Sequence, residues 1–440
     1  MRYFFIIFFI IIGGNSFSQE AVSGKYFLVG ETQYKFTYFS PSNLNFKNNN
    51  VKRLIIVLHG RTRTAEQRQN AIIQAANTEN EFLETLIISP HFIGSQELAA
   101  HNLDNNHLYW QDKEWMEGGL SSSSGSYPRE ESFSSFEVMD DIISQIIYSE
   151  NFPNLAQIIL TGFSGGGQFM NRYASSNRIQ EKFEDENNIV FKYLVAAPSS
   201  FMYFNDERRV EGTTDQFEKP SVPNCPSYNN YKYGPVNMNE YMKYYHLDTL
   251  IARYKRRDIS YGVGSRDNNP NSSSLDDTCQ GMLQGDHRLE RANIYVNYMT
   301  HLHGDLGENH KLTVASGVGH DSFAFYNKNN VRLLLFPEIT NTPKNNQTEE
   351  DPLGIESDAG ILLYPTISSK NLFLKANASK NPIVSIFDTK GIPSNNIKIH
   401  TINESLLKID IDKLYQGLYI LLYTDKTLKK PKRVKFIKRK

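Results

Sequence analysis

The chain has 440 residues, of which 22% are charged and 39% hydrophobic, and its formal net charge is −1. This length fits one large domain and a small one. Residues 425–440 hold nine Lys or Arg and one Asp, a surplus of eight positive charges, so the rest of the chain carries −9. Because that body repels phosphate, the composition excludes a nucleic-acid-binding protein.

The first residues have the pattern of an export signal. Met1 and Arg2 precede the apolar run 3–12, and small residues follow up to Ser18. One basic residue, a short apolar stretch and small residues two apart are typical of a secretory signal peptide, here residues 1–18. The alternative, a membrane anchor, needs roughly 20 apolar residues, and the run is shorter. We therefore expect a protein that is secreted or held at the cell surface.

Strands and helices alternate over residues 19–336. Residues 25–30 and 33–40, joined by a Gly-Glu-Thr turn, predict a hairpin. Short apolar runs with little alternation then predict strands buried on both faces, at 54–58, 86–89, 157–161, 193–196, 259–263 and 311–315. Helical patterns lie between them, at 65–77, 133–149, 166–175, 286–302 and 322–335. This alternation predicts the α/β class, with a doubly wound and mostly parallel sheet.

Two long polar segments, 91–132 and 200–247, interrupt the alternation. Loops of this length inside a compact domain usually serve function. Residues 337–358 are rich in Pro, Asn, Thr and Glu without an apolar period, which predicts a linker.

The remainder, residues 359–440, changes to short strands of alternating polarity with Gly391 and Gly417 at turns. The predicted strands are 372–375, 383–387, 406–411, 419–423 and 433–437. They predict a small antiparallel β-sandwich.

The sequence Gly162-Phe163-Ser164-Gly165-Gly166 lies between a predicted strand and a predicted helix. A strand that turns directly into a helix leaves little room beside the residue between them, so glycine is needed on both sides. The turn exposes the serine Oγ at the carboxyl edge of the sheet, where the helix dipole and the N–H of Gly165 favour an oxyanion. A phosphate-binding loop is the alternative, but no Gly-Lys-Ser/Thr follows. The pattern predicts that Ser164 is a nucleophile.

A serine nucleophile needs a base and an acid, which in this fold follow in the order Ser, acid, His. His320, among eleven histidines, lies just after the predicted strand 311–315. Asp267 follows the strand 259–263, and its loop is expected beside that of His320. The alternative acids are Asp276, Asp277 and Asp321.

The oxyanion needs a second N–H donor from the loop after strand 54–58, which reads His59-Gly60-Arg61-Thr62. Gly60 lets the backbone approach closely. The expected donor is the N–H of Arg61, with Thr62 as the alternative, and His59 is expected to pack beneath the site.

Trp110 and Trp115 are the two tryptophans of the chain, and both lie in the segment 91–132. Rim aromatics in such a loop bind a substrate by stacking on a sugar or an aromatic acyl group. Packing within the loop is the alternative, and the sequence leaves both open.

Cys225 and Cys279 are the two cysteines. Export permits a disulfide between them, which would close a loop of about 50 residues and stabilise the fold by about 4 kcal/mol; two unpaired thiols are the alternative. Residues 267–278 lack the glycine and glutamate of a calcium loop, and His301-x-His303 lacks further zinc spacing. We expect neither a metal nor a cofactor.

Four motifs stand in order along the chain: His59-Gly60, Gly162-Phe-Ser-Gly-Gly-Gly167, Asp267 and Gly319-His320. Together they resemble the serine hydrolases of the α/β-hydrolase superfamily over about residues 25–336, and within it secreted esterases of the polyhydroxybutyrate depolymerase and feruloyl esterase type. The resemblance implies hydrolysis of a small-molecule or polymeric ester through an acyl-enzyme, with Ser164, Asp267 and His320 as the catalytic triad. A secreted serine peptidase using the same triad and a non-catalytic surface binder of the same fold are the alternatives.

The C-terminal region has its own resemblance, which starts from Leu363-Tyr364-Pro365, Val384-Ser-Ile-Phe-Asp388 and Leu414-Tyr-Gln-Gly-Leu-Tyr419 with a basic closing strand. These motifs resemble the sorting domain of type IX secretion, although Thr366 stands where Asn-Pro normally follows. The resemblance implies that this domain contacts the outer-membrane secretion machinery. A carbohydrate-binding or adhesive sandwich is the alternative.

Overall fold

The computed structural model describes residues 22–30, 32–304, 306, 309–339 and 361–438, the last range with gaps at 365–366, 369, 377–382, 389–390, 395–396, 404–405 and 425–431. The predicted signal peptide and, from residue 340 on, the predicted linker lie outside the described residues. Within these ranges, no helix combines the length and the apolar character that crossing a bilayer requires.

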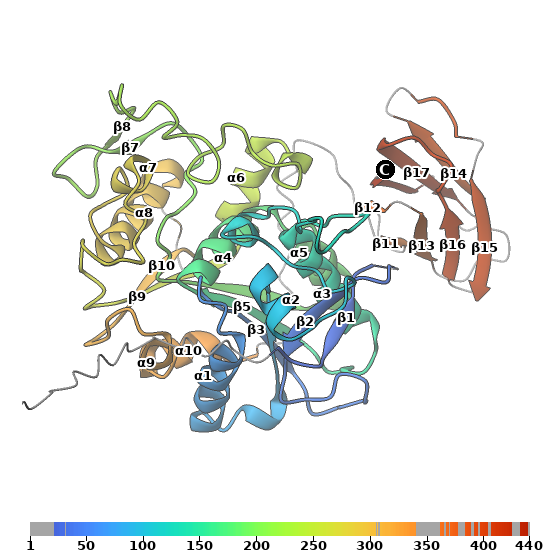
Figure 1. Cartoon of the computed structure of the whole chain (residues 1–440), viewed down its shortest axis with the longest axis horizontal. Helices are drawn as coiled ribbons and strands as arrows, with labels where there is room; N and C mark the ends of the chain where they lie inside the picture. The colour runs from blue at the N-terminus through green and yellow to red at the C-terminus, as the bar shows by residue number, and fades with distance from the viewer. Residues whose placement is uncertain are drawn as a thin grey trace, which may run out of the picture.

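Eight strands form the central sheet. They are β1 (Tyr26–Leu28), β2 (Lys35–Phe39), β3 (Arg53–Leu58), β4 (Thr85–Pro90), β5 (Gln157–Phe163), β6 (Val190–Ala196), β9 (Asp258–Gly264) and β10 (Lys311–Ala315). Their order is β1-β2-β4-β3-β5-β6-β9-β10 (Figure 1). The pairs β1–β2 and β2–β4 are antiparallel, and every other neighbouring pair is parallel. The predicted hairpin and the mostly parallel sheet are confirmed.

Helices connect the strands. They are α1 (Ala65–Thr78), α2 (Ser95–Ala100), α3 (Ser135–Tyr148), α4 (Gly165–Ser176), α5 (Gln180–Asn187), α6 (Leu247–Arg256), α7 (Cys279–Met282), α8 (Arg288–His303), α9 (Ser322–Tyr326) and α10 (Asn329–Leu335), with the 3-10 turns η1 (Phe82–Glu84), η2 (Glu114–Glu117) and η3 (Met242–Tyr244). The single helix predicted over 322–335 is two helices. The side-chain amide of Asn327 donates to the carbonyl of Phe323 at 2.9 Å and so competes with the backbone where α9 ends.

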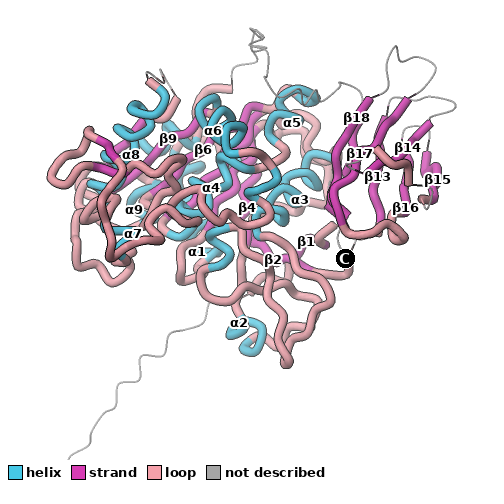
Figure 2. The backbone as a smooth tube through the Cα atoms, turned by 90° about the horizontal axis from the view of Figure 1, so that it is seen from above, coloured by secondary structure: helices cyan, strands magenta, loops and turns pink. Residues whose placement is uncertain are grey.

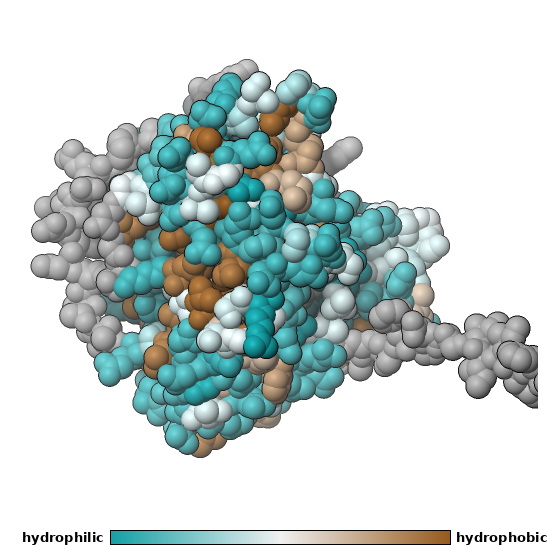
Figure 3. Space-filling view, turned by 90° about the vertical axis from the view of Figure 1, so that its left-hand side faces the viewer, coloured by the Kyte–Doolittle hydropathy of each residue, from teal (hydrophilic) through white to brown (hydrophobic). Residues whose placement is uncertain are grey.

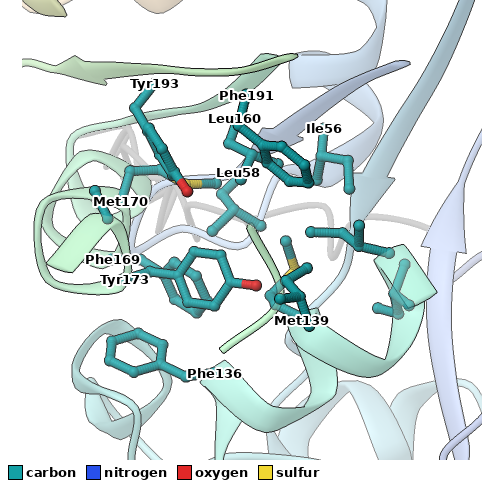
Figure 4. Close-up of a cluster of buried hydrophobic side chains, with 14 of the residues drawn as sticks. Ile56, Leu58, Phe136, Met139, Leu160, Phe169, Met170, Tyr173, Phe191 and Tyr193 are labelled. Atoms are coloured by element: carbon teal, nitrogen blue, oxygen red, sulfur yellow. The ribbon is translucent and has the colours of Figure 1, made fainter. Parts of the chain in front are cut away.

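The sheet separates two hydrophobic cores, because successive side chains of a strand point to opposite faces. Ile56 and Leu58 of β3 face one core, which α3, α4, α6 and α8 cover. Ile55 and Val57 face the other core, which α1, α9 and α10 cover. Figure 2 shows helices on both sides of the strands, and Figure 4 shows side chains of α3 and α4 packed against those of the strands. The predicted fold class, a doubly wound and mostly parallel α/β sheet, is confirmed.

The two long segments remain largely irregular. Residues 91–132 contain only α2 and η2, and residues 200–247 contain the short strands β7 (Arg208–Arg209) and β8 (Phe217–Glu218) with η3. Cys225 in the second segment forms a disulfide with Cys279 of α7, with an S–S distance of 2.03 Å. The predicted bridge therefore ties this segment to the chain just before α8.

The C-terminal domain contains two four-stranded sheets. Its strands are β11 (Ile361–Tyr364), β12 (Ile367–Ser368), β13 (Asn371–Ala376), β14 (Ile383–Asp388), β15 (Lys398–Asn403), β16 (Leu406–Asp410), β17 (Gly417–Thr424) and β18 (Lys432–Lys438). The orders are β11-β13-β16-β15 and β12-β18-β17-β14. All pairs are antiparallel except β12–β18. The predicted antiparallel sheets are confirmed, and the buried residues Leu374, Ile386, Ile409, Leu421 and Phe436 belong to their shared core.

The surface at the β10 side of the molecule is mostly hydrophilic. Figure 3 looks onto this side, which carries α7 and α8 in Figure 1, and shows a group of hydrophobic residues near the centre of the view. Exposed hydrophobic side chains at this end of the sheet include Met282 of α7, Val314 of β10 and Phe323 of α9.

Candidate active site

Ser164 occupies the turn between β5 and α4 with φ +60° and ψ −111°, a left-handed conformation that costs energy for a residue with a side chain. Two glycines let the chain close on itself here. A Cβ on Gly162 would lie 2.5 Å from the backbone carbon and oxygen of Gly166, and a Cβ on Gly166 would lie 2.7 Å from the carbonyl oxygens of Leu58 and His59. The start of α4 therefore packs directly on β5 and β3.

The structure brings Ser164, His320 and Asp267 into one hydrogen-bonded row. The Nε2 of His320 lies 3.0 Å from the Oγ of Ser164, and its Nδ1 lies 2.6 Å from Oδ2 of Asp267. The three residues follow the carboxyl ends of β5, β10 and β9, which meet at one edge of the sheet. Because Nδ1 faces a carboxylate and donates to it, Nε2 of the neutral ring accepts the proton of the serine.

Burial differs along this row. The side chain of Asp267 is 5% exposed, whereas that of His320 is 23% exposed. The carboxylate is thus shielded from water that would weaken its hold on the imidazole. The imidazole and the hydroxyl remain open to an incoming molecule.

Two of the alternative acids, Asp321 and Asp276, have other partners. The Oδ1 of Asp321 caps α9 by accepting from the N–H of Ala324 at 3.1 Å. Asp276 accepts from the hydroxyl of Tyr233 at 2.9 Å. Within the described part of the chain, the carboxylate at hydrogen-bonding distance from His320 is that of Asp267.

Two backbone N–H groups point to an oxyanion site beside Ser164. A Cβ built on Gly165 would lie 3.1 Å from the backbone nitrogen of Arg61, so the two residues adjoin. Among the described residues, neither N–H donates to another protein group; that of Gly165 is free because it begins α4. Both predicted donors are therefore next to each other and available. The N–H of Thr62, the alternative donor, likewise donates to no backbone group among the described residues, so the closeness of Arg61 to Gly165 is what favours Arg61.

His59 supports the loop that carries Arg61. The ring is fully buried, its Nδ1 donates to the carbonyl of Gly60 at 2.8 Å, and its Nε2 accepts from the N–H of Phe92 at 3.0 Å. Burial first, and then the repulsion that a proton on His59 would meet from a protonated His91, hold the pKa of His59 well below its usual value. The ring is therefore neutral, and it links the loop after β3 to the chain after β4.

Trp110 and Trp115 are both 0% exposed. The Nε1 of Trp110 donates to the carbonyl of Gly119 at 3.0 Å, and the ring of Trp115 stacks on Phe92 with centroids 5.1 Å apart. Trp115 also contacts His59, at 4.5 Å between ring centroids. The prediction that these tryptophans bind substrate as rim aromatics does not describe this geometry, because the segment folds back and its rings fill the core beneath the oxyanion loop.

Two neighbours of the site carry no sequence signal. A Cβ on Gly165 would come within 2.8 Å of Cε of Met116, so this buried methionine packs against the start of α4. The Nη1 of Arg288 lies 3.4 Å from Oδ1 of Asp267. Neither residue belongs to a motif, and each reaches the site through tertiary contacts alone.

The metal-like patterns in the sequence do not gather ligands. Among the described residues, no group of three or more His, Cys, Asp or Glu side chains is arranged to hold a metal ion. The side-chain oxygen of Asn269 accepts from the N–H of Asn271 at 3.0 Å, and Nε2 of His301 lies 3.0 Å from Glu207.

No family model matches the chain, and no curated protein matches it. Similar solved structures include poly(aspartic acid) hydrolase-1 from Sphingomonas sp. KT-1, at 17% identity and a TM-score of 0.44, covering 70% of this chain and 96% of that one. LpqC, a poly(3-hydroxybutyrate) depolymerase from Bordetella parapertussis, has 19% identity and a TM-score of 0.45, covering 69% and 86%. Siderophore hydrolase EstA from Aspergillus nidulans has 12% identity and a TM-score of 0.33, covering 71% and 91%. The strand order and the geometry at Ser164 stand without these likenesses.

Proposed function

We propose that the protein is a serine hydrolase that cleaves carboxylic esters through an acyl-enzyme. The observation that carries this proposal is the 3.0 Å approach of His320 Nε2 to Ser164 Oγ, with the other ring nitrogen bonded to a buried carboxylate. A hydroxyl becomes nucleophilic when an oriented base removes its proton. The strained turn and the two free N–H groups supply the other parts that acyl transfer needs.

The reaction follows from this arrangement. Ser164 Oγ attacks the carbonyl carbon while His320 takes the hydroxyl proton, and the N–H groups of Arg61 and Gly165 stabilise the oxyanion. Collapse of the tetrahedral intermediate breaks the ester bond as His320 protonates the leaving alcohol. Water then attacks the acyl-enzyme by the same route and releases the acid. Asp267 remains ionised and stabilises the imidazolium.

The choice of esters over peptides rests on the sequence resemblance to polyhydroxybutyrate depolymerases and feruloyl esterases. The same triad cleaves amides in serine peptidases. An esterase and a peptidase are therefore distinguished by measuring which substrate is turned over, because the geometry of the triad is the same in both.

The test compares the wild type with Ser164→Ala on p-nitrophenyl acetate and butyrate and on a peptide p-nitroanilide. We expect ester turnover by the wild type and a loss of about 10⁴-fold or more in kcat/KM in the variant, at an unchanged Tm. Ser175→Ala is the matched control, because that hydroxyl lies on the same helix and only donates to the carbonyl of Arg172. Undiminished ester turnover by Ser164→Ala refutes the proposal, and faster turnover of the anilide than of the esters assigns a peptidase.

We further propose that the chain is exported and that residues 359–440 address it across the outer membrane. This proposal rests on the sequence alone, namely the signal-peptide pattern of residues 1–18 and the sorting-domain motifs within residues 359–440. In a host with type IX secretion, the full chain is expected outside the cell with residues 1–18 removed, and a chain lacking residues 359–440 is expected in the periplasm. Equal export of both chains contradicts the role of the C-terminal domain.

A further inference from the structure

The helix α8 begins with a buried arginine. Arg288 is its first residue, and the side chain is 1% exposed. A cation in the first turn of a helix is opposed by the helix dipole, and a buried guanidinium is costly unless it is paired. Both costs indicate that the guanidinium is stabilised by a negatively charged or hydrogen-bonding group close by.

The partner is the carboxylate of the catalytic row. Nη1 of Arg288 lies 3.4 Å from Oδ1 of Asp267, while Oδ2 of the same carboxylate accepts from His320 at 2.6 Å. Asp267 is therefore held between a guanidinium on one oxygen and an imidazole on the other.

The guanidinium is itself fastened to the loop that carries Asp267. It donates to the backbone oxygen of Ser274 and, at 3.0 Å, to its hydroxyl. The N–H of Leu289 donates to the carbonyl of Asp267 at 3.1 Å. Residues 267–274 are thus bound to the start of α8 through side chain and backbone, which restricts rotation of the carboxylate.

We propose that Arg288 is a positioning residue, which fixes the Asp267 carboxylate for His320 and offsets part of its negative charge; this rests on the function proposed above. Positioning keeps the imidazole aligned with Ser164. The positive charge of Arg288 also weakens the attraction between the Asp267 carboxylate and a positive charge on the ring of His320, so its removal is expected to change how the rate depends on pH.

The other charged residues near Arg288 and Asp267 either have partners of their own or are exposed to water. Arg291, also buried on α8, donates to the carbonyl of Gly285 at 2.8 Å, and its charge interacts with those of Asp276 and Arg288. Arg266 and Asp321 adjoin the pair in sequence and are exposed, so water screens them. Arg291 therefore offers a matched control: a buried arginine on the same helix that makes no contact with Asp267.

The test measures the rate of labelling of Ser164 by a fluorophosphonate across pH, which requires no knowledge of the substrate. For Arg288→Gln we expect the labelling rate at pH 7 to fall about tenfold. We also expect the acid limb of the pH–rate profile, the range in which the rate falls as the pH is lowered, to move upward by about one pH unit. Arg288→Lys keeps the charge without the planar fork, so its limb stays in place while the rate falls about threefold. Arg291→Gln is expected to leave the limb where it is.

A further pair of variants tests whether Arg288 acts through the carboxylate of Asp267. In an Asp267→Asn background, Arg288→Gln is expected to lower the labelling rate little further, because the carboxylate that Arg288 positions is gone. The inference is overturned if Arg288→Gln keeps the wild-type limb and a rate within about twofold, or if Arg291→Gln produces the same shift. If the glutamine variant does not fold, a wild-type rate in Arg288→Lys overturns it. Absence of labelling in the wild type would instead refute the proposed function.

Discussion

The turn around Ser164 and the long segments 91–132 and 200–247 are held in place by different means. The turn is held by backbone packing, since glycines let α4 approach β5 and β3 with no room for a Cβ. Residues 200–247 are held by the Cys225–Cys279 disulfide and by Arg208, whose Nη2 donates to the carbonyls of Tyr228 and Tyr233 at 3.2 Å each. The turn therefore depends on close approach of the backbone, whereas residues 200–247 depend on a disulfide and on side-chain hydrogen bonds between residues far apart in the sequence.

The largest effect is expected from Gly162→Ala. The new methyl group would lie 2.5 Å from the backbone of Gly166, and backbone cannot move aside as a flexible side chain does. We expect a loss of about 4 kcal/mol or more in the free energy of unfolding, measured by denaturant titration, together with loss of ester turnover.

Gly60→Ala is the control for this prediction. Its Cβ would make ordinary contacts, at 3.7 Å from the carbonyl oxygen of Phe163 and from Cβ of Ser164. We expect a change below about 1 kcal/mol. Equal losses in the two variants would show that the turn is not held by close backbone packing.

A smaller effect is expected from removing the disulfide with Cys225→Ser and Cys279→Ser together. The bridge spans a sequence separation of 54, so its loss frees the unfolded chain and lowers the free energy of unfolding by about 4 kcal/mol. The rate of fluorophosphonate labelling of Ser164 is expected to change little, while KM for a bulky ester rises. A labelling rate that falls in step with stability would break the separation between the turn and the loops.

The smallest effect is expected on the stability of the fold at low pH. Burial lowers the pKa of His91, the first residue of the segment 91–132, to about 3. Since the unfolded chain takes up a proton near pH 6.5 and the folded chain does not, the stability is full above pH 6.5 and is lost as the pH falls toward 3. This site alone accounts for about 2 kcal/mol between pH 7 and pH 5. His91→Leu is expected to flatten that slope in thermal melts, and an unaltered slope would contradict a buried neutral ring.

Elements with a strong local pattern were predictable from sequence. The predicted runs 54–58 and 157–161 lie inside β3 and β5, because strands buried on both faces are continuously apolar. The positions of Ser164 and His320 followed from a strand that ends at a glycine-rich turn, a pattern that depends on adjacent residues. The strand β15, Lys398–Asn403, was missed because its sequence lacks a clear apolar alternation.

What depends on distant contacts was not predictable. Trp110 and Trp115 have the composition of rim aromatics, and only the path of the whole segment places them in the core. Arg288 reaches Asp267 from the start of α8, and nothing in its sequence neighbourhood distinguishes it from a surface arginine. The roles of such residues can be recognised only once the structure shows which loops meet at the carboxyl edge of the sheet.

In the proposed mechanism, the hydroxyl of Ser164 reacts because His320 and Asp267 activate it. The most direct measurement is peptide mapping by mass spectrometry after fluorophosphonate treatment of the wild type and of His320→Gln. We expect one covalent adduct, on the peptide carrying Ser164, and a rate of adduct formation that is lower by about 10³-fold or more in His320→Gln. An adduct on another residue, or equal labelling of Ser164 without the imidazole, would contradict this mechanism.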